Sequence, residues 1–267
     1  MFETDASSGA LISLRDVTVL RSGKEILFDL SWEVKTGERW VIVGANGAGK
    51  TTILSILGCY LHPSRGRAVI LGNELGKVDT VEMKTRIGMT SASLLALIPE
   101  NEAVGDIVLS SAYGIYGRWN EEYDPWDESR SSAILAALGV RELRDRQFST
   151  LSEGEKKRVM IARALMPDPE LLLMDEPAAG LDLGGREDLI RRISHFSADP
   201  TAPATVMVTH HLEEIPTGTT HALLLKSGRC FAQGPIADVI TSENLSALYG
   251  LTVELETRYG RYFARSL

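Results

Sequence analysis

Cysteine, basic charge and long apolar runs are all scarce in this chain of 267 residues, and each scarcity excludes a class of protein. The two cysteines, Cys59 and Cys230, stand in apolar settings without the spacing of a metal site, so we expect reduced core or near-core thiols. The longest apolar stretches, such as LLLM at 171–174, are far shorter than the roughly 20 residues that span a bilayer. A membrane role would therefore have to come through a partner protein.

The deficit of basic charge argues against nucleic acid as a partner. The formal net charge is −8, whereas nucleic-acid and anionic-membrane surfaces are usually met by basic patches. The tyrosines and tryptophans are scattered along the chain and form no base-stacking platform. The first residues, MFETDASSGA, lack the basic start and apolar core of a signal peptide, so we expect a cytoplasmic protein.

The first strong motif is GANGAGKT at 44–51, which directly follows the apolar run WVIV. It satisfies the G-x-x-x-x-G-K-[ST] spacing of a phosphate-binding loop, in which glycines let backbone N–H groups wrap an anion. The lysine reaches the outer phosphates and the threonine hydroxyl can ligate magnesium. TTILSILGCYL, which starts at the threonine of the motif, has helical spacing, so the loop opens onto a helix N-terminus whose dipole favours the same anion. A plain glycine-rich turn is the alternative, but strand, loop and helix all agree with a nucleotide site. The expected binding residues are Gly44, Ala45, Asn46, Gly47, Ala48, Gly49, Lys50, Thr51 and Thr52.

The order of apolar patterns indicates an α/β fold. ISLRDVTVL and ILFDLSWEV predict two antiparallel strands joined by RSGKE, and AVILG at 68–72 predicts another strand. From about residue 91 to 165 the pattern is helical. LLLMD, ATVMVTH and HALLLK then read as buried strands separated by the helical GGREDLIRRISHF, which is typical of a parallel sheet with crossover helices. RCFAQG and TVELETRYGRYF predict small antiparallel hairpins, the latter turning at Tyr259-Gly260.

Two adjacent carboxylates end the predicted strand LLLMDEP at 171–177. Asp175 is placed to hold magnesium through water, and Glu176, one residue further toward the γ-phosphate, is suited to act as general base on an attacking water. An acidic strand end alone is a weak signal. Together with the phosphate loop about 125 residues upstream it becomes a strong one.

LSEGEKKRVMIARAL at 151–165 allows two interpretations. Ser152 followed by Glu155 three residues later is the spacing of a capping box at a helix start. The same residues resemble the signature loop LSGGQ of the ATP-binding-cassette (ABC) ATPases. That resemblance implies that Ser152 and Gly154, with the helix dipole, bind the γ-phosphate of ATP held by an opposite subunit. Glu153 and Glu155 depart from the commonest form, and Glu155 stands where the family usually has a side-chain contact to the ribose region.

The resemblance extends over nearly the whole chain. AAGLD at 178–182 resembles the D-loop, which would carry Asp182 toward the partner's site. VMVTHH at 206–211 resembles the switch segment with His210 in the histidine position, which implies contact with the γ-phosphate and a hold on Glu176 and the water. His211 is expected to be only a neighbour at a helix start.

Two positions depart from the family pattern. An aromatic residue normally stacks on adenine just before the second strand, and here that position is Arg21, whose planar guanidinium can also stack. In IGMTSASLL at 87–95 the family normally has glutamine, and this chain offers Ser91, Ala92 and Ser93. We expect this loop to serve coupling to a permease more than chemistry.

The resemblance implies a P-loop NTPase core with an N-terminal antiparallel β subdomain and an inserted helical signature subdomain. We expect one domain over 1–267, with the nucleotide-binding core at about 1–90 and 166–250, the helical subdomain at about 91–165, and a C-terminal hairpin at about 251–267. The implied cofactors are ATP and magnesium.

The implied function is a peripheral ATPase on the cytoplasmic face of the cell membrane. It would pair head to tail with a second copy and drive a separate permease. The closing LSALYGLTVELETRYGRYF and the S-A-S loop resemble uptake ATPases for metal chelates or oxyanions. One alternative is a non-transport ABC ATPase in a cytosolic assembly, although the roughly 100 residues between loop and signature leave no room for long heptad arms. A catalytically dead module is disfavoured because Lys50, Asp175, Glu176 and His210 are all present.

Overall fold

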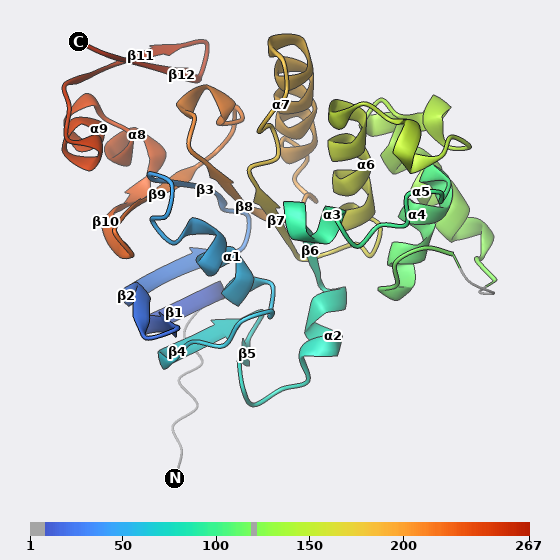
Figure 1. Cartoon of the computed structure of the whole chain (residues 1–267), viewed down its shortest axis with the longest axis horizontal. Helices are drawn as coiled ribbons and strands as arrows, with labels where there is room; N and C mark the ends of the chain where they lie inside the picture. Colours follow the sequence, from blue (N-terminus) through green and yellow to red (C-terminus); the bar gives the residue numbers. More distant parts are fainter. Residues whose placement is uncertain (1–8, 119–121) are drawn as a thin grey trace.

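The computed structural model describes residues 9–118 and 122–267, so most of the polar N-terminal lead lies outside the described residues. In this part of the chain no helix is both long and apolar enough to cross a membrane. Cys59 is buried and Cys230 half-buried, and both are free thiols. The helical elements α3 to α6 gather on one side of the molecule and the N-terminal strands on the other (Figure 1).

The N-terminal sheet is antiparallel throughout and has the strand order β2-β1-β4-β5. Ser22 and Gly23 connect the first two strands with φ values of 50° and 76°, the left-handed pair that a two-residue hairpin turn requires. The predicted antiparallel pair is therefore confirmed. The strands are β1 (Ala10–Arg21), β2 (Lys24–Lys35), β4 (Arg65–Ile70) and β5 (Asn73–Glu74).

The main sheet has the order β10-β9-β3-β8-β7-β6 and is parallel except at one edge. Its strands are β3 (Arg39–Val43), β6 (Ile87–Thr90), β7 (Leu171–Asp175), β8 (Ala204–Thr209), β9 (His221–Lys226) and β10 (Arg229–Pro235). The predicted α/β fold with a mainly parallel sheet is confirmed.

One strand is placed differently from the expectation. RCFAQG does not fold back on itself as a separate hairpin but forms β10, which pairs antiparallel with β9 at the edge of the main sheet. Ser227 and Gly228, with φ values of 49° and 77°, make the tight turn that brings it back. Alternate residues of β10 are exposed, as expected for an edge strand with one covered face.

The C-terminal segment forms the two-stranded sheet predicted for TVELETRYGRYF. Strands β11 (Val253–Arg258) and β12 (Arg261–Ser266) pair in register, and Tyr259 and Gly260 turn the chain with φ values of 52° and 72°. Arg261 forms a two-pronged ion pair with Glu187 of α7 at 2.9 and 3.2 Å. This ion pair connects the hairpin to α7.

The helices are α1 (Lys50–Leu57), α2 (Thr80–Thr85), α3 (Ala92–Leu95), α4 (Val104–Ser110), α5 (Pro125–Ala137), α6 (Glu153–Leu165), α7 (Leu183–Ser197), α8 (Ile236–Val239) and α9 (Ser242–Tyr249). Short 3-10 turns cover Ser111–Tyr113, Arg141–Leu143, Phe148–Thr150 and Leu212–Glu214.

Strand β7 separates two hydrophobic cores. Leu171 and Leu173 belong to the cluster that contains the apolar residues of α1 and the N-terminal sheet. Leu172 and Met174 belong to the cluster formed by α4, α5, α6 and α7. This alternation is the period of a strand buried on both faces, which explains why LLLM is apolar without interruption.

Candidate active site

The phosphate loop joins the end of β3 to the start of α1. Gly49 is the residue before the helix and has φ of 105°, and Gly47 has φ of 78°, both in the left-handed region that favours glycine. A Cβ atom on Gly49 would lie 2.7 Å from Leu27 Cδ2 and 3.1 Å from the carbonyl oxygen of Ile26. The loop therefore passes so close to β2 that only glycine fits at this position.

Lys50 is buried inside this loop. Its ammonium donates hydrogen bonds to the carbonyl oxygens of Gly44 at 2.8 Å and Ala45 at 3.1 Å. Burial lowers the pKa of Lys50, while the nearby carboxylates of Glu176 and Asp175 raise it. The geometry thus places a desolvated cation against the backbone of the phosphate loop.

The first acid, Asp175, is the last residue of β7 and faces the start of α1. The hydroxyl of Thr51 donates a hydrogen bond of 3.4 Å to Asp175 Oδ1. Burial and the charge of Glu176 raise the pKa of Asp175, and the hydrogen bond from Thr51 and the charge of Lys50 oppose this rise. A hydroxyl and a carboxylate oxygen side by side are the hard donors that magnesium prefers, so these residues fit that ion.

The second acid, Glu176, has φ of 47°, which is uncommon for a residue with a side chain. Its N–H donates to the carbonyl oxygen of Val208 at 3.0 Å, which holds this conformation in place. Its Oε1 lies 3.0 Å from Nδ1 of His210, just after the end of β8. Because an ionised Glu176 can only accept, the pair requires the imidazole proton on Nδ1.

A cavity of about 270 Å³ opens beside these groups. Glu176, Asp175 and Thr51 line one side, and Thr90 and Ser91 line another. The hydroxyl of Thr90 is buried and has no hydrogen-bond partner within the described residues. A buried polar atom without a partner is costly unless water or a ligand satisfies it, so the cavity is suited to a polar occupant.

The comparisons with known proteins decide the family. The sequence profile described as ABC transporter matches residues 27–179. The uncharacterised ABC transporter ATP-binding protein YlmA of Bacillus subtilis (strain 168) is 41% identical over 256 residues, which cover 95% of this chain and 96% of that protein. The chain belongs to the ABC transporter family. It is an ATP-binding subunit and an ATPase.

Two further comparisons bear on this ABC ATPase. The hemin import ATP-binding protein HmuV of Rhodococcus jostii (strain RHA1) is 34% identical over 93% of this chain and 83% of that protein. A solved dimeric ATP-binding cassette in a post-hydrolysis state with ADP and phosphate has the same fold. Its TM-score is 0.72 at 23% identity, over 84% of this chain and 98% of that one.

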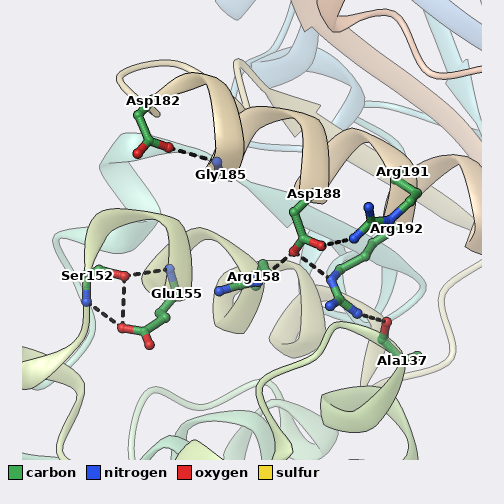
Figure 2. Close-up of polar contacts among 9 residues, drawn as sticks. All are labelled: Ala137, Ser152, Glu155, Arg158, Asp182, Gly185, Asp188, Arg191 and Arg192. Carbon is green, nitrogen blue, oxygen red and sulfur yellow. Dashed lines mark hydrogen bonds and ion pairs between the residues drawn. The ribbon is translucent and has the colours of Figure 1, made fainter.

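The signature segment of this ABC ATPase forms the capping box that its sequence allowed. Ser152 precedes α6, and its N–H and hydroxyl both donate to Glu155 Oε2, at 2.7 and 2.8 Å (Figure 2). The backbone N–H of Ser152, followed by its hydroxyl, holds the pKa of Glu155 below the usual range, although burial opposes this. A carboxylate charge therefore lies directly beside the signature serine.

The structure does not bring all the predicted residues together. Ser152 and Gly154 lie at the start of α6, and Asp182 caps the start of α7 by accepting a 2.8 Å hydrogen bond from the N–H of Gly185 (Figure 2). Within residues 9–118 and 122–267, the side chain of Ser152 hydrogen bonds only to Glu155. In the described part of the chain no side-chain hydrogen bond joins Ser152 to the phosphate loop at residues 44–52.

The two departures from the family pattern lie on different elements. Arg21 is the exposed last residue of β1, and its stacking on adenine stays a prediction. Ser91 caps the start of α3, and its hydroxyl lies 2.9 Å from that of Ser93. Ser91 lines the cavity beside the acidic pair, which brings this loop near the chemistry.

Lys157 is a cavity residue that the sequence reasoning missed. Its ammonium donates to the carbonyl oxygen of Ala179 and, at 3.4 Å, to that of Glu176, and burial lowers its pKa. The only sequence signal was its place in LSEGEKKR, since nothing there indicates that the side chain crosses to the segment after β7.

Proposed function

We propose that this ABC ATPase pairs head to tail with a second copy, encloses two ATP molecules with magnesium, and drives a separate membrane permease. The observation that carries the proposal is the 3.0 Å contact between His210 Nδ1 and Glu176 Oε1, with Glu176 in a cavity that Asp175 also lines. A general base needs such a partner to hold its orientation. The exposed signature serine, which does not contact its own phosphate loop, supports a pocket completed by the second copy.

Each group has a role that follows from its position. Lys50 and the backbone N–H groups of residues 44–52 bind the phosphates. Thr51 and Asp175 would hold magnesium, which supplies charge neutralisation at the phosphates when bound. Glu176 takes a proton from water as the water oxygen bonds to the γ-phosphorus and the bond to the β–γ bridging oxygen breaks. His210 keeps the Glu176 carboxylate oriented toward that water.

A second groove supports the permease as partner. It measures about 280 Å³ and is lined by the exposed apolar side chains of Tyr60, Val81 and Tyr113, among others. Exposed apolar groups gathered in one groove mark an interaction site. Leu94 of α3 lines this groove, and Ser91 at the start of the same helix lines the catalytic cavity. We propose that the permease docks here, so that its movement is transmitted through α3.

We propose uptake of a metal chelate or an oxyanion as the transported class, with the protein at the cytoplasmic face of the cell membrane. Of the two classes, the hemin-import name of the Rhodococcus relative favours a metal chelate. A non-transport role in a cytosolic assembly has no comparable support, because the family comparisons name transporters.

The first experiment tests the catalytic pair. Glu176→Gln should bind ATP and form a dimer by light scattering but hydrolyse ATP about 10²-fold or more slowly, the usual contribution of a general base. His210→Ala should also lose activity. His211→Ala is the matched control, because its ring lies tilted beside that of His210, with centroids 4.1 Å apart, and it is His210 that contacts Glu176. Near-normal turnover of Glu176→Gln would refute its role.

The second experiment tests the shared pocket. Lys50→Ala and Ser152→Ala should damage opposite halves of one composite site. Mixing the two single mutants should yield dimers with one intact pocket and one doubly damaged pocket. If the mixture binds ATP no better than either parent, the head-to-tail arrangement is wrong.

A further inference from the structure

Asp188 of α7 lies at the centre of an ion cluster between two helices (Figure 2). Its Oδ2 accepts hydrogen bonds from Arg158 of α6 at 2.7 Å and from Arg192 of α7 at 2.8 Å. Its Oδ1 pairs with Arg191. The side chains of Asp188, Arg158 and Arg192 are 21%, 21% and 27% exposed, so the bridge between the helices is shielded from water much more than Arg191, which is 74% exposed. A shielded, hydrogen-bonded pair holds its geometry better than a surface pair.

The cluster lies equally far behind two functional helix ends. Arg158 is six residues after Ser152, and Asp188 is six residues after Asp182. At 1.5 Å per residue, both helix starts project about 9 Å beyond the bridge. Figure 2 shows the two starts on the same side of it. The two starts also lie close together, since a Cβ placed on Gly154 would lie 3.7 Å from Cδ2 of Leu181, the residue before Asp182.

Arg192 extends the same cluster to a third helix. Its Nη1 donates to the carbonyl oxygen of Ala137 at the end of α5 at 3.1 Å. The guanidinium occupies space that only a glycine leaves, because a Cβ on Gly139 would lie 2.6 Å from Nη1. These contacts therefore fix the position of α7 relative to both α5 and α6.

We infer that Asp188 is a positioning residue that locks Ser152 and Asp182 into one rigid unit, which is presented to the nucleotide of the partner subunit. The inference rests on the proposed head-to-tail dimer. Asp188 touches no nucleotide and acts through Arg158. Loss of the bridge lets the two helix starts move independently, and the pocket that they complete belongs to the other copy.

The test uses dimers with a single working pocket. All subunits carry Glu176→Gln, so that bound ATP is retained, and one subunit, purified by its own tag, also carries Lys50→Ala. The remaining pocket then combines the phosphate loop of the subunit that keeps Lys50 with the signature loop of the Lys50→Ala subunit. The measurement is the lifetime of radiolabelled ATP retained in the dimer.

Placement of Asp188→Asn distinguishes positioning from general stability. In the Lys50→Ala subunit, which supplies the signature loop, it should shorten the lifetime at least fivefold. In the other subunit it should change the lifetime less than twofold. Asp188→Glu, which keeps the charge, should restore most of the lifetime, and Arg191→Ala is the matched control because it removes a partner of Asp188 that does not bridge the helices.

Equal effects in both placements, or no effect in either, would overturn the inference. A Lys50→Ala control dimer that retains no ATP at all would instead refute the head-to-tail arrangement, and the role of Asp188 with it. The two failures are therefore distinguishable.

Discussion

Glu155 provides the sharpest test of the proposal that the signature loop binds phosphate. Its carboxylate oxygen lies 2.8 Å from the hydroxyl oxygen of Ser152. The hydroxyl has a single proton, so it must turn away from Glu155 to donate to a phosphate oxygen at about 2.8 Å, and the two anions then lie about 5 Å apart on either side of it. Replacing Glu155 by glutamine keeps an oxygen for the capping box and removes the charge.

The size of the effect follows from Coulomb's law. At about 5 Å, two unit charges repel by roughly 0.8 kcal/mol at a dielectric constant of 80 and by roughly 3 kcal/mol at 20. Since Ser152 is exposed, the lower end applies, and about 1 kcal/mol corresponds to about a fivefold change in affinity. Glu155→Gln should therefore lower the ATP concentration for half-maximal dimerisation about fivefold.

The assay is light scattering against ATP concentration in the Glu176→Gln background, at about 0.05 and about 0.5 M salt. The gain should shrink at high salt, because screening shortens the reach of an exposed charge. Glu153→Gln is the matched control, since Glu153 pairs with Lys156 at 3.0 Å and does not contact Ser152. Unchanged or weaker dimerisation of Glu155→Gln at the lower salt concentration, or a gain that does not shrink at the higher one, would refute the reasoning.

Arg21 should discriminate weakly between adenine and guanine, because a stacked guanidinium contacts no base edge. The rates of ATP and GTP hydrolysis should therefore differ by less than about 100-fold, and a larger ratio would contradict recognition by stacking alone. Alanine at both Ser91 and Ser93 should change basal turnover within about tenfold, since a bridging water can replace a short side chain at about 0–2 kcal/mol. The same variant should reduce permease-stimulated turnover more strongly, and complete loss of basal turnover would show these serines to be catalytic. The hydrogen bond from Arg261 holds the pKa of Glu187 below its ordinary value of 4.5. The ion pair therefore stabilises the fold above that value and is lost as the pH falls below it. Arg261→Gln should lower Tm at pH 7, with a deficit that narrows in calorimetry below about pH 4.5, and a deficit independent of pH would argue against the pair.

Local sequence patterns were sufficient to predict much of the fold, and the site residues that lie in the phosphate loop and after β7. The phosphate loop and the acids after β7 depend on short motifs with a fixed order of strand, loop and helix, which sequence carries directly. The hairpin turns at Ser22-Gly23 and Tyr259-Gly260 each place a glycine at the second position, where the positive φ of 76° or 72° suits that residue.

Long-range contacts account for what sequence did not indicate. The polar crossing of Lys157 to the carbonyl of Ala179 and the bridge from Arg158 to Asp188 join residues 22 and 30 positions apart, on separate elements. Neither partner carries a local signal, because charged residues on helices are ordinarily solvated. The position of β10 at the edge of the main sheet could not be predicted from its sequence either, because the pairing of a strand depends on the whole sheet and not on the strand alone.

Because the residues of β7 alternate between two cores, the strand tolerates amino-acid substitutions better than it tolerates insertions or deletions. Asp175 lies on the same face of β7 as Leu171 and Leu173, toward α1, and accepts a hydrogen bond from Thr51 there. Glu176 follows with a left-handed backbone and lines the cavity. A strand that slips by one residue exchanges its two faces completely. A codon deleted from β7 would thus put Glu176 in the place of Asp175, and an inserted codon would put Asp175 in the place of Glu176. In either case no single point substitution would restore both the acid proposed to bind metal and the acid proposed to act on water. Apolar substitutions within β7 leave the positions of the two acids unchanged, whereas any change in the length of the strand moves both.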